Sequence, residues 1–225
     1  DDEVTIKGYE GSKTTLTIPS EIDGKKVTKI GANAFDSNTS ITSVEIPDSV
    51  TTIDSYAFYN ATALESVSIP ESVTTMNEGA FANCTALTSI ELPARLSSTR
   101  YNFLYGCDAL TSITMKDGAQ KFAAVDNVLY NVSSDKAVMV VYPGGKTETE
   151  YTIPTEVNGK AVTSTAMHLF RNNPVLKKVT VPASITSLGG YTFNGMKAIE
   201  EIVLEHETAP SIGSEICTEM NPGSK

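Results

Sequence analysis

ALESVSIPESVTTMNEGAF, residues 63–81, recurs in altered form along most of the chain. Its clearest marks are an apolar residue followed by proline, as in Ile69-Pro70, and the phenylalanine at its end. Phe35, Phe58 and Phe81 are 23 residues apart, and Phe170 and Phe193 keep the same spacing. A fixed period of this length indicates stacked units, each too small to bury its apolar face alone.

Within each repeat, the positions nine and eleven residues after the phenylalanine position are apolar, and the residue between them is polar in most repeats. These pairs are Val44 and Ile46, Val67 and Ile69, Ile90 and Leu92, Ile113 and Met115, Val179 and Val181, and Ile202 and Leu204. Such alternation predicts a short half-buried strand. The proline that follows in most repeats cannot donate to a sheet, so it ends the strand. Strands that recur in one direction predict a parallel ladder with a step of ~4.8 Å.

The rest of the repeat is shorter and less regular. A second inward-facing pair follows the proline, such as Val50 with Ile53 or Val73 with Met76. The segments that enter the phenylalanine, such as GANAF and NEGAF, are too short for a stable helix of their own. We expect a helical turn or a short 3₁₀ segment there.

The spacing of the apolar positions, the Ile-Pro after the strand and the Ala-Phe before the turn resemble the BspA-like leucine-rich-repeat family of bacterial surface proteins. The resemblance covers nearly the whole chain. It implies a β-rich α/β solenoid, a right-handed superhelix with one short parallel strand in each repeat of ~23 residues. Similar hairpins interrupt the arrays of that family, and here Val128-Leu129-Tyr130, Tyr142-Pro143, Gly145-Lys146 and residues 151–154 match them.

We therefore expect one solenoid over residues 1–225, divided into five parts. These are an N-terminal cap and first turn (1–34), a first repeat array (35–116), a β-hairpin insertion (117–153), a second array (154–205) and an irregular tail or truncated repeat (206–225). Asp23-Gly24 and Asn158-Gly159 predict a tight turn at the start of each array. Val138 to Tyr142 is apolar throughout, which predicts a strand buried on both faces. In the degraded fourth repeat, Leu104 keeps the phenylalanine position and Thr99 replaces an inward apolar residue.

The net charge of the chain argues against two classes of partner, and its hydropathy argues against a membrane-spanning segment. The formal net charge of −10 disfavours a nucleic acid, whose phosphates need a footprint of lysine and arginine, and equally an anionic membrane surface. No apolar run approaches the ~20 residues of a membrane span. The chain begins DDEV with no signal peptide, so a secreted protein would be represented here by its mature or trimmed form.

Cys84 and Cys107 occupy the same position in neighbouring repeats. Stacked strands would bring their Cα atoms close enough for a disulfide, but with nearly parallel Cβ vectors, which is poor disulfide geometry. We expect two buried thiols that pack as small apolar groups, with a disulfide as the alternative. Cys217 lies in the irregular tail and has no evident partner.

Nothing in the sequence points to an enzyme, a cofactor or a metal. The two histidines, His168 and His206, share no metal-ligand spacing with a cysteine or carboxylate, and we interpret them as ordinary turn or surface residues. No nucleophile elbow, zinc-protease, phosphate-loop or dinucleotide motif occurs. Gly144-Gly145-Lys146 lacks the rest of a phosphate loop, and the exit of the hairpin explains it.

The remaining candidate site is the outer face of the first strand ladder. Its residues, with those just before each strand, are Thr42, Ser43, Glu45, Glu65, Ser66, Ser68, Thr88, Ser89, Glu91, Thr111, Ser112 and Thr114. This surface of hydroxyls and carboxylates suits hydrogen bonding but offers no anchor of the Trp, Tyr or Arg kind. The simpler explanation of the pattern is solubility with good β-propensity.

The leading functional hypothesis is a non-catalytic, secreted or cell-surface module that binds a macromolecule, and we expect it to be a monomer. The resemblance implies adhesion to a host or matrix protein or to a glycan. The alternative is a structural spacer or stalk that presents another domain. In the second array Lys177 and Lys178 stand one repeat before Glu200 and Glu201, and opposite charges on neighbouring strands attract. We therefore expect a ligand to engage residues 42–114 rather than 177–203.

Overall fold

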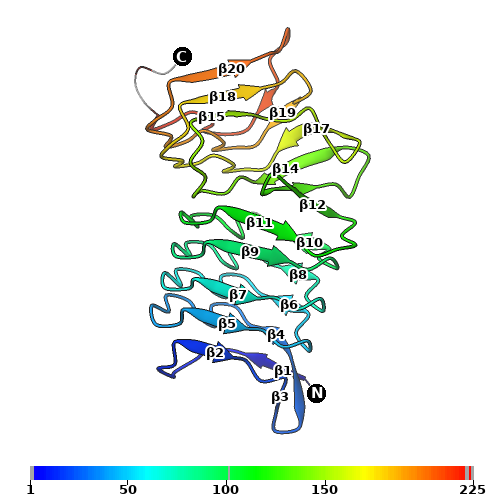
Figure 1. The fold of residues 1–225 in the computed structure, drawn as a ribbon, viewed down its shortest axis with the longest axis vertical. Helices are drawn as coiled ribbons and strands as arrows, with labels where there is room; N and C mark the ends of the chain where they lie inside the picture. The colour runs from blue at the N-terminus through cyan, green and yellow to red at the C-terminus, as the bar shows by residue number, and fades with distance from the viewer. Residues whose placement is uncertain (1–2, 101, 221–222, 224–225) are drawn as a thin grey trace. The chain divides into compact units, whose positions relative to one another are not determined.

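The computed structural model describes residues 3–100, 102–220 and 223, and these residues form strands and turns but no helix. The chain divides into two compact units, residues 1–122 and residues 123–225. Each unit is a stack of short parallel strands (Figure 1). The predicted leucine-rich-repeat solenoid with a recurring parallel strand is confirmed. Whether residues 1–225 form one continuous domain stays a prediction.

The first unit has a ladder of predicted strands, called here the front ladder. It contains β2 (Thr15–Thr17), β5 (Ser43–Glu45), β7 (Ser66–Ser68), β9 (Ser89–Leu92) and β11 (Ser112–Met115). β2, β5 and β7 form one parallel sheet, β9 and β11 form another, and β7 lies beside β9 (Figure 1). Val44 pairs with Val67 and Ile90 with Ile113, which is the predicted repeat register.

Each repeat of the first unit also carries a second short strand, and together these make the back ladder. It contains β1 (Glu3–Ile6), β4 (Lys25–Ile30), β6 (Thr52–Ile53), β8 (Thr75–Met76) and β10 (Ser98–Thr99). The second member of each inward pair that follows a proline, such as Ile53 or Met76, therefore lies in a strand, and the first member precedes it. Thr99 pairs with Met76, so the fourth repeat keeps the register despite its polar residue.

The segments that enter each phenylalanine are hydrogen-bonded turns, and the expected helical turn or 3₁₀ segment is wrong. Asp36 donates its amide to the Asn33 carbonyl at 3.1 Å, which closes a single turn. Alternate amides instead donate to the next repeat, as Phe35 does to the Ala57 carbonyl at 2.7 Å. A helix would need those amides for bonds within its own segment, so the stacking of repeats prevents one.

The core of the first unit is a column of stacked phenylalanine rings. The ring centroids of Phe35 and Phe58 lie 4.8 Å apart and those of Phe58 and Phe81 lie 5.0 Å apart, with planes within 3°. Phe81 donates its amide to Phe103, as Phe58 does to Ala80, so Leu104 holds the phenylalanine position as predicted. Both Phe103 and Leu104 are buried.

The second unit repeats the two-ladder arrangement around its own core. Its front ladder contains β15 (Glu150–Thr152), β18 (Lys178–Val181) and β20 (Glu201–Leu204). Its other sheet runs in the order β12 (Phe122–Val125), β13 (Val128–Asn131), β14 (Ala137–Val141), β17 (Lys160–Thr165), β19 (Ser187–Leu188) and β21 (Ser211–Ile212). β12 begins at the border between the units.

The predicted hairpin insertion is confirmed, because β13 and β14 pair antiparallel. The expectation that Val138 to Tyr142 is buried on both faces is wrong in part. Met139 and Tyr142 are buried, whereas Val138, Val140 and Val141 are half-buried. One face of β14 packs on the core with Ala137 and Met139, and the other face is only partly covered.

Both predicted tight turns are hairpins. β3 (Glu21–Ile22) pairs antiparallel with β4, and β16 (Glu156–Val157) pairs antiparallel with β17. Asp23 and Asn158 have φ of 52°, and the glycines that follow them have φ of 75°. Two successive left-handed residues are the requirement of a type I′ turn, which explains Asp-Gly and Asn-Gly.

The two ends of the chain join the ladders. The two N-terminal strands do not pair with each other, because β1 pairs with β4 and β2 with β5, so the predicted cap starts both ladders at once. In the tail, β21 pairs parallel with β19, which makes it part of a further repeat. The predicted cap, first array and tail also include residues 1–2, 101, 221–222 and 224–225, which lie outside the described residues.

Candidate functional site

All twelve residues of the predicted face lie on the front ladder of the first unit or directly before one of its strands. We call them the front face. Nine are exposed, namely Glu45, Glu65, Ser66, Ser68, Thr88, Ser89, Glu91, Thr111 and Thr114, and three are half-buried, namely Thr42, Ser43 and Ser112. The alternation that buries Val44, Ile90 and Ile113 turns their neighbours outward.

Part of the hydrogen-bonding capacity of the front face is used between repeats. Ser66 Oγ donates to Ser43 Oγ at 3.0 Å, and Thr111 Oγ1 donates to the Thr88 carbonyl at 3.2 Å. Thr17 Oγ1 donates to Glu45 Oε2 at 3.1 Å. A carboxylate has about four acceptor sites, so Glu45 keeps capacity for a further donor.

The charge around the front face is of one sign. Between Ile30 and Ala94 the sequence has no Lys, Arg or His. The acidic residues of that interval are Asp36, Glu45, Asp48, Asp54, Glu65, Glu71, Glu78 and Glu91. Two of them meet lysines from outside the interval: Asp54 Oδ2 lies 2.5 Å from Lys29 Nζ, and Glu71 Oε1 lies 3.8 Å from Lys116 Nζ. The three glutamates of the front face have no ion pair among the described residues.

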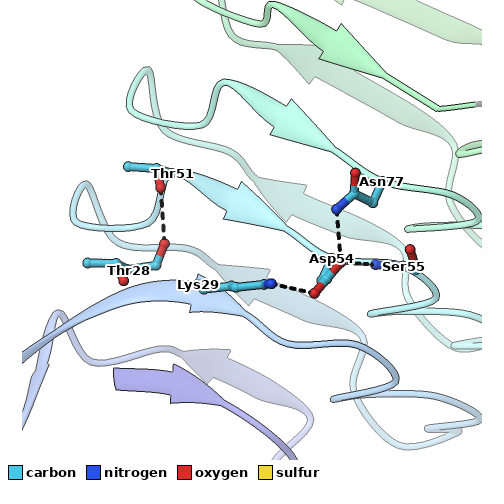
Figure 2. Close-up of polar contacts among 6 residues, drawn as sticks. All are labelled: Thr28, Lys29, Thr51, Asp54, Ser55 and Asn77. Atoms are coloured by element: carbon cyan, nitrogen blue, oxygen red, sulfur yellow. Dashed lines mark hydrogen bonds and ion pairs between the residues drawn. The ribbon is translucent and has the colours of Figure 1, made fainter. Parts of the chain in front are cut away.

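Asp54 belongs to a closed polar network next to the back ladder, shown in Figure 2. Besides the Lys29 ammonium, its carboxylate accepts the Asn77 side-chain amide at 2.8 Å and the Ser55 backbone amide at 2.9 Å. Burial alone would raise the pKa of Asp54, but these hydrogen bonds and the Lys29 charge hold that pKa below its ordinary value. The network is satisfied internally, so we assign it to stability.

On the front ladder of the second unit, two lysines form ion pairs with glutamates of the next repeat. Lys177 Nζ lies 3.0 Å from Glu200 Oε1, and Lys178 Nζ lies 2.7 Å from Glu201 Oε2. Lys178 and Glu201 are direct partners in the pairing of β18 with β20. The predicted attraction between these neighbouring repeats is confirmed, and these lysines and glutamates are already partnered.

The two histidines have structural contacts. The His206 ring donates from Nε2 to the Ile185 carbonyl at 2.6 Å, and the His168 ring stacks on Tyr191 with centroids 4.8 Å apart. Among residues 3–100, 102–220 and 223, no three His, Cys, Asp or Glu side chains are grouped as a metal site would need. The same residues contain no helix long and apolar enough to span a membrane.

Cys84 and Cys107 are buried thiols, as expected, and each donates to the backbone. Cys84 Sγ lies 3.2 Å from the Phe58 carbonyl oxygen, and Cys107 Sγ lies 3.1 Å from that of Phe81. The hydrogen bond with Cys84, together with burial, raises the pKa of Cys107 well above its ordinary value. The Cys107 thiol is therefore protonated. Cys84 and Cys107 are both buried away from solvent, whereas Cys217 is exposed.

Two tyrosines that the sequence analysis did not single out lie on the turns of the first unit. The rings of Tyr56 and Tyr59 meet at 84° with centroids 5.5 Å apart, and Tyr56 Oη donates to Glu78 Oε1 at 2.8 Å. Both rings are half-buried. A signal was present in the sequence, because the other repeats of the first unit place Asn33, Gly79 or Asn102 at the position of Tyr56.

A family model described as the BspA type leucine rich repeat region matches residues 9–133 and 151–221 in six copies. Comparison with curated proteins finds no match. A leucine rich cell surface protein of Faecalibacterium prausnitzii is similar in structure, with 26% identity, a TM-score of 0.55, and coverage of 88% of this chain and 71% of that one.

Two further solved structures share the fold at lower identity. The pneumococcal vaccine antigen PcpA has 19% identity and a TM-score of 0.66, over 98% of this chain and 73% of its own. A leucine rich repeat protein of T. pallidum has 22% identity and a TM-score of 0.55, over 94% of this chain and 78% of its own.

Proposed function

Because the chain belongs to the BspA-type leucine-rich-repeat family, we propose that it is a non-catalytic binding module of a bacterial cell-surface or secreted protein. The similar protein of Faecalibacterium prausnitzii is named as a cell surface protein, which supports this location. Repeat solenoids offer extended surfaces built from equivalent positions, and such surfaces suit contact with a macromolecule.

One observation carries the proposal: the front face of the first unit is polar and mostly exposed, and it has no ion pair with any residue that the structure describes. Its glutamates are Glu45, Glu65 and Glu91, and each is exposed. Hydroxyls such as those of Ser68 and Thr114 are exposed on other strands of the same ladder. A partner that supplies hydrogen-bond donors would find acceptors there without first breaking an ion pair.

The chemistry of the face narrows the partner to a basic or hydroxyl-rich macromolecule, either a host or matrix protein or a glycan. A nucleic acid does not fit, because its phosphates would meet a chain with a net charge of −10. Adhesion is the activity that such binding would support. We propose that the module acts as a monomer and needs no cofactor.

The experiment begins with arrays of matrix proteins and glycans, probed with the purified chain. The binding of each ligand is then measured for two surface variants. One changes Ser66, Ser89 and Ser112 to Arg on the front face, and the other combines Lys177→Glu with Lys178→Glu on the second unit. We expect the serine variant to lose binding and the lysine variant to keep it.

The opposite pattern, loss with the lysine variant alone, would refute the assignment of the front face. An absence of any ligand on broad arrays would instead favour the spacer function, in which the module holds another domain away from the cell. Circular dichroism of each variant checks that its fold is retained.

A further inference from the structure

Tyr56 in the first unit and Tyr191 in the second occupy the same position of the repeat, two residues before Phe58 and Phe193. Both have left-handed backbones, with φ of 58° and 59°. Each donates its amide to the next repeat: Tyr56 to the Glu78 carbonyl at 2.8 Å, and Tyr191 to the Ser214 carbonyl at 3.0 Å. The two tyrosines therefore have equivalent backbone positions in their repeats.

In the second unit a cation of the chain itself covers the tyrosine. The Arg171 guanidinium carbon lies 5.5 Å from the centroid of the Tyr191 ring, within the range of a cation–π interaction. The His168 ring stacks on the same tyrosine, with planes within 10°. Arg171 comes from the repeat before Tyr191, one residue after Phe170.

In the first unit the equivalent position carries an anion. Asp36 follows Phe35 in the repeat before Tyr56, as Arg171 follows Phe170. The local backbone agrees: Asp36 donates its amide to the Asn33 carbonyl at 3.1 Å, and Arg171 donates to the His168 carbonyl at 3.2 Å. Where the second unit has Arg171, the first unit therefore has an exposed carboxylate, one repeat before its tyrosine.

The rest of the Tyr56 environment is also suited to a cation. The Tyr59 ring meets Tyr56 at nearly a right angle, and the Glu78 carboxylate accepts from the Tyr56 hydroxyl. On the next repeat, Gly79 leaves room for the ring, since a Cβ there would lie 2.6 Å from the Tyr56 ring carbons. The ring is thus held by its neighbours, and an immobilised aromatic loses little entropy on binding.

We propose that Asp36, Tyr56, Tyr59 and Glu78 form a binding site for a cationic side chain, arginine or lysine, of a polypeptide partner. The cation would take the place over Tyr56 that Arg171 takes over Tyr191. Two carboxylates and two aromatic rings are the groups that attract and desolvate such a cation. The interval from Ile30 to Ala94, which has no Lys, Arg or His, adds a negative field that favours its approach.

The site lies on the turns and shares no residue with the front face. It depends on the proposed function only for the premise that the chain binds a macromolecule. The probe is a fluorescein-labelled peptide of alternating glycine and arginine, and its control has citrulline, which keeps the shape of arginine without the charge. Fluorescence anisotropy measures the Kd of each peptide for the full chain.

The main variant combines Tyr56→Asn with Tyr59→Ala. Asn33 and Asn102 already occupy the first position in other repeats and Ala82 occupies the second, so the backbone should accept both changes. The net charge is unchanged, so non-specific attraction of the peptide stays constant. We expect binding of the arginine peptide to weaken by roughly three- to thirty-fold, the range of one cation–π contact.

Two further variants make the test independent of any loss of folding. Asp36→Arg should fill the site as Arg171 does and weaken binding at least as much, with both tyrosines intact. Tyr191→Asn should leave the Kd unchanged, because that ring is already covered.

Equal binding of the arginine and citrulline peptides would overturn the proposal, as would an unchanged Kd in both the tyrosine and Asp36→Arg variants. If the serine variant of the front face loses its array ligand and the tyrosine variant binds the peptide more weakly, the proposed function and the turn site both stand. If the tyrosine variant keeps the peptide and the wild type still binds an array ligand, only the turn site fails.

Discussion

The two units share the same fold but differ in whether their outward-facing charged side chains are paired. On the second unit, lysines pair with glutamates across neighbouring strands and Arg171 covers Tyr191. On the first unit, the glutamates of the front face and Asp36, one repeat before Tyr56, have no such cation among the described residues. The difference lies only at outward positions, which the fold leaves free to vary. In the second unit these side chains are paired with each other, whereas in the first unit the carboxylates remain available to a partner.

If the difference is confined to outward positions, inward positions should have equal importance in both units. Phe81 stacks on Phe58 at 5.0 Å, and Phe193 stacks on Phe170 at 5.8 Å. Phe81→Ala and Phe193→Ala should each lower the free energy of unfolding by roughly 3–5 kcal/mol, as for other buried phenylalanines. Chemical denaturation measures both. A loss below about 1 kcal/mol for either would show that the repeat register is wrong there.

A second comparison concerns glycines with a left-handed backbone. Gly79 in the first unit has φ of 60° and lies against the Tyr56 ring, whereas Gly159 in the second has φ of 75° and open space around it. Gly159→Ala should cost about 1–2 kcal/mol of stability, from backbone strain alone. Gly79→Ala should cost more, because the Tyr56 ring must also move. Equal losses by thermal and chemical denaturation would mean that Tyr56 does not pack on Gly79.

The loss of stability in acid should depend in part on Asp54 of the first unit. Its folded-state pKa is below its ordinary value of 3.8. The stability that Asp54 contributes is therefore complete above about pH 3.8 and is lost as the pH falls through the lower folded-state pKa. We expect Asp54→Asn to destabilise the chain at pH 7 and to flatten the dependence of stability on pH below 4. If the stability of this variant falls in acid as much as that of the wild type, other carboxylates cause the loss.

The smallest effect on stability is expected for the ion pairs of Lys177 and Lys178 on the surface of the second unit. Lys177, Lys178 and their glutamate partners are all substantially exposed, so water and salt screen the pairs. Lys177→Glu with Lys178→Glu should reduce stability slightly at low ionic strength, and the reduction should vanish in 1 M NaCl. A loss that persists at high salt would mean that these pairs do more than neutralise charge.

The predictions that were confirmed rest on the repeat period and on the residues that favour particular turns. The phenylalanine column, the strand register, the hairpins at Asp23-Gly24 and Asn158-Gly159, and the attraction of Lys178 to Glu201 all follow from position within a repeat. These features depend on residues close in sequence or one period apart. Their geometry is therefore fixed once the stacking of repeats is recognised.

The features that were missed depend on bonds between repeats. The back ladder consists largely of two-residue strands, too short for a recognisable alternation, and the turns avoid a helix because their amides donate to the next repeat. The contrast between Tyr56 and Tyr191 needs the identity of the residue one repeat earlier, Asp36 or Arg171. A hydrophobic pattern carries no information about that pair.

The central claim is that a basic partner contacts the first unit and not the second. The most direct measurement is photo-crosslinking of the full chain with a glycine–arginine peptide that carries a diazirine, followed by mapping of the linked residues by mass spectrometry. The account predicts crosslinks within residues 31–114 that the citrulline peptide does not give. Crosslinks concentrated within residues 166–204, or spread equally over both units, would contradict it.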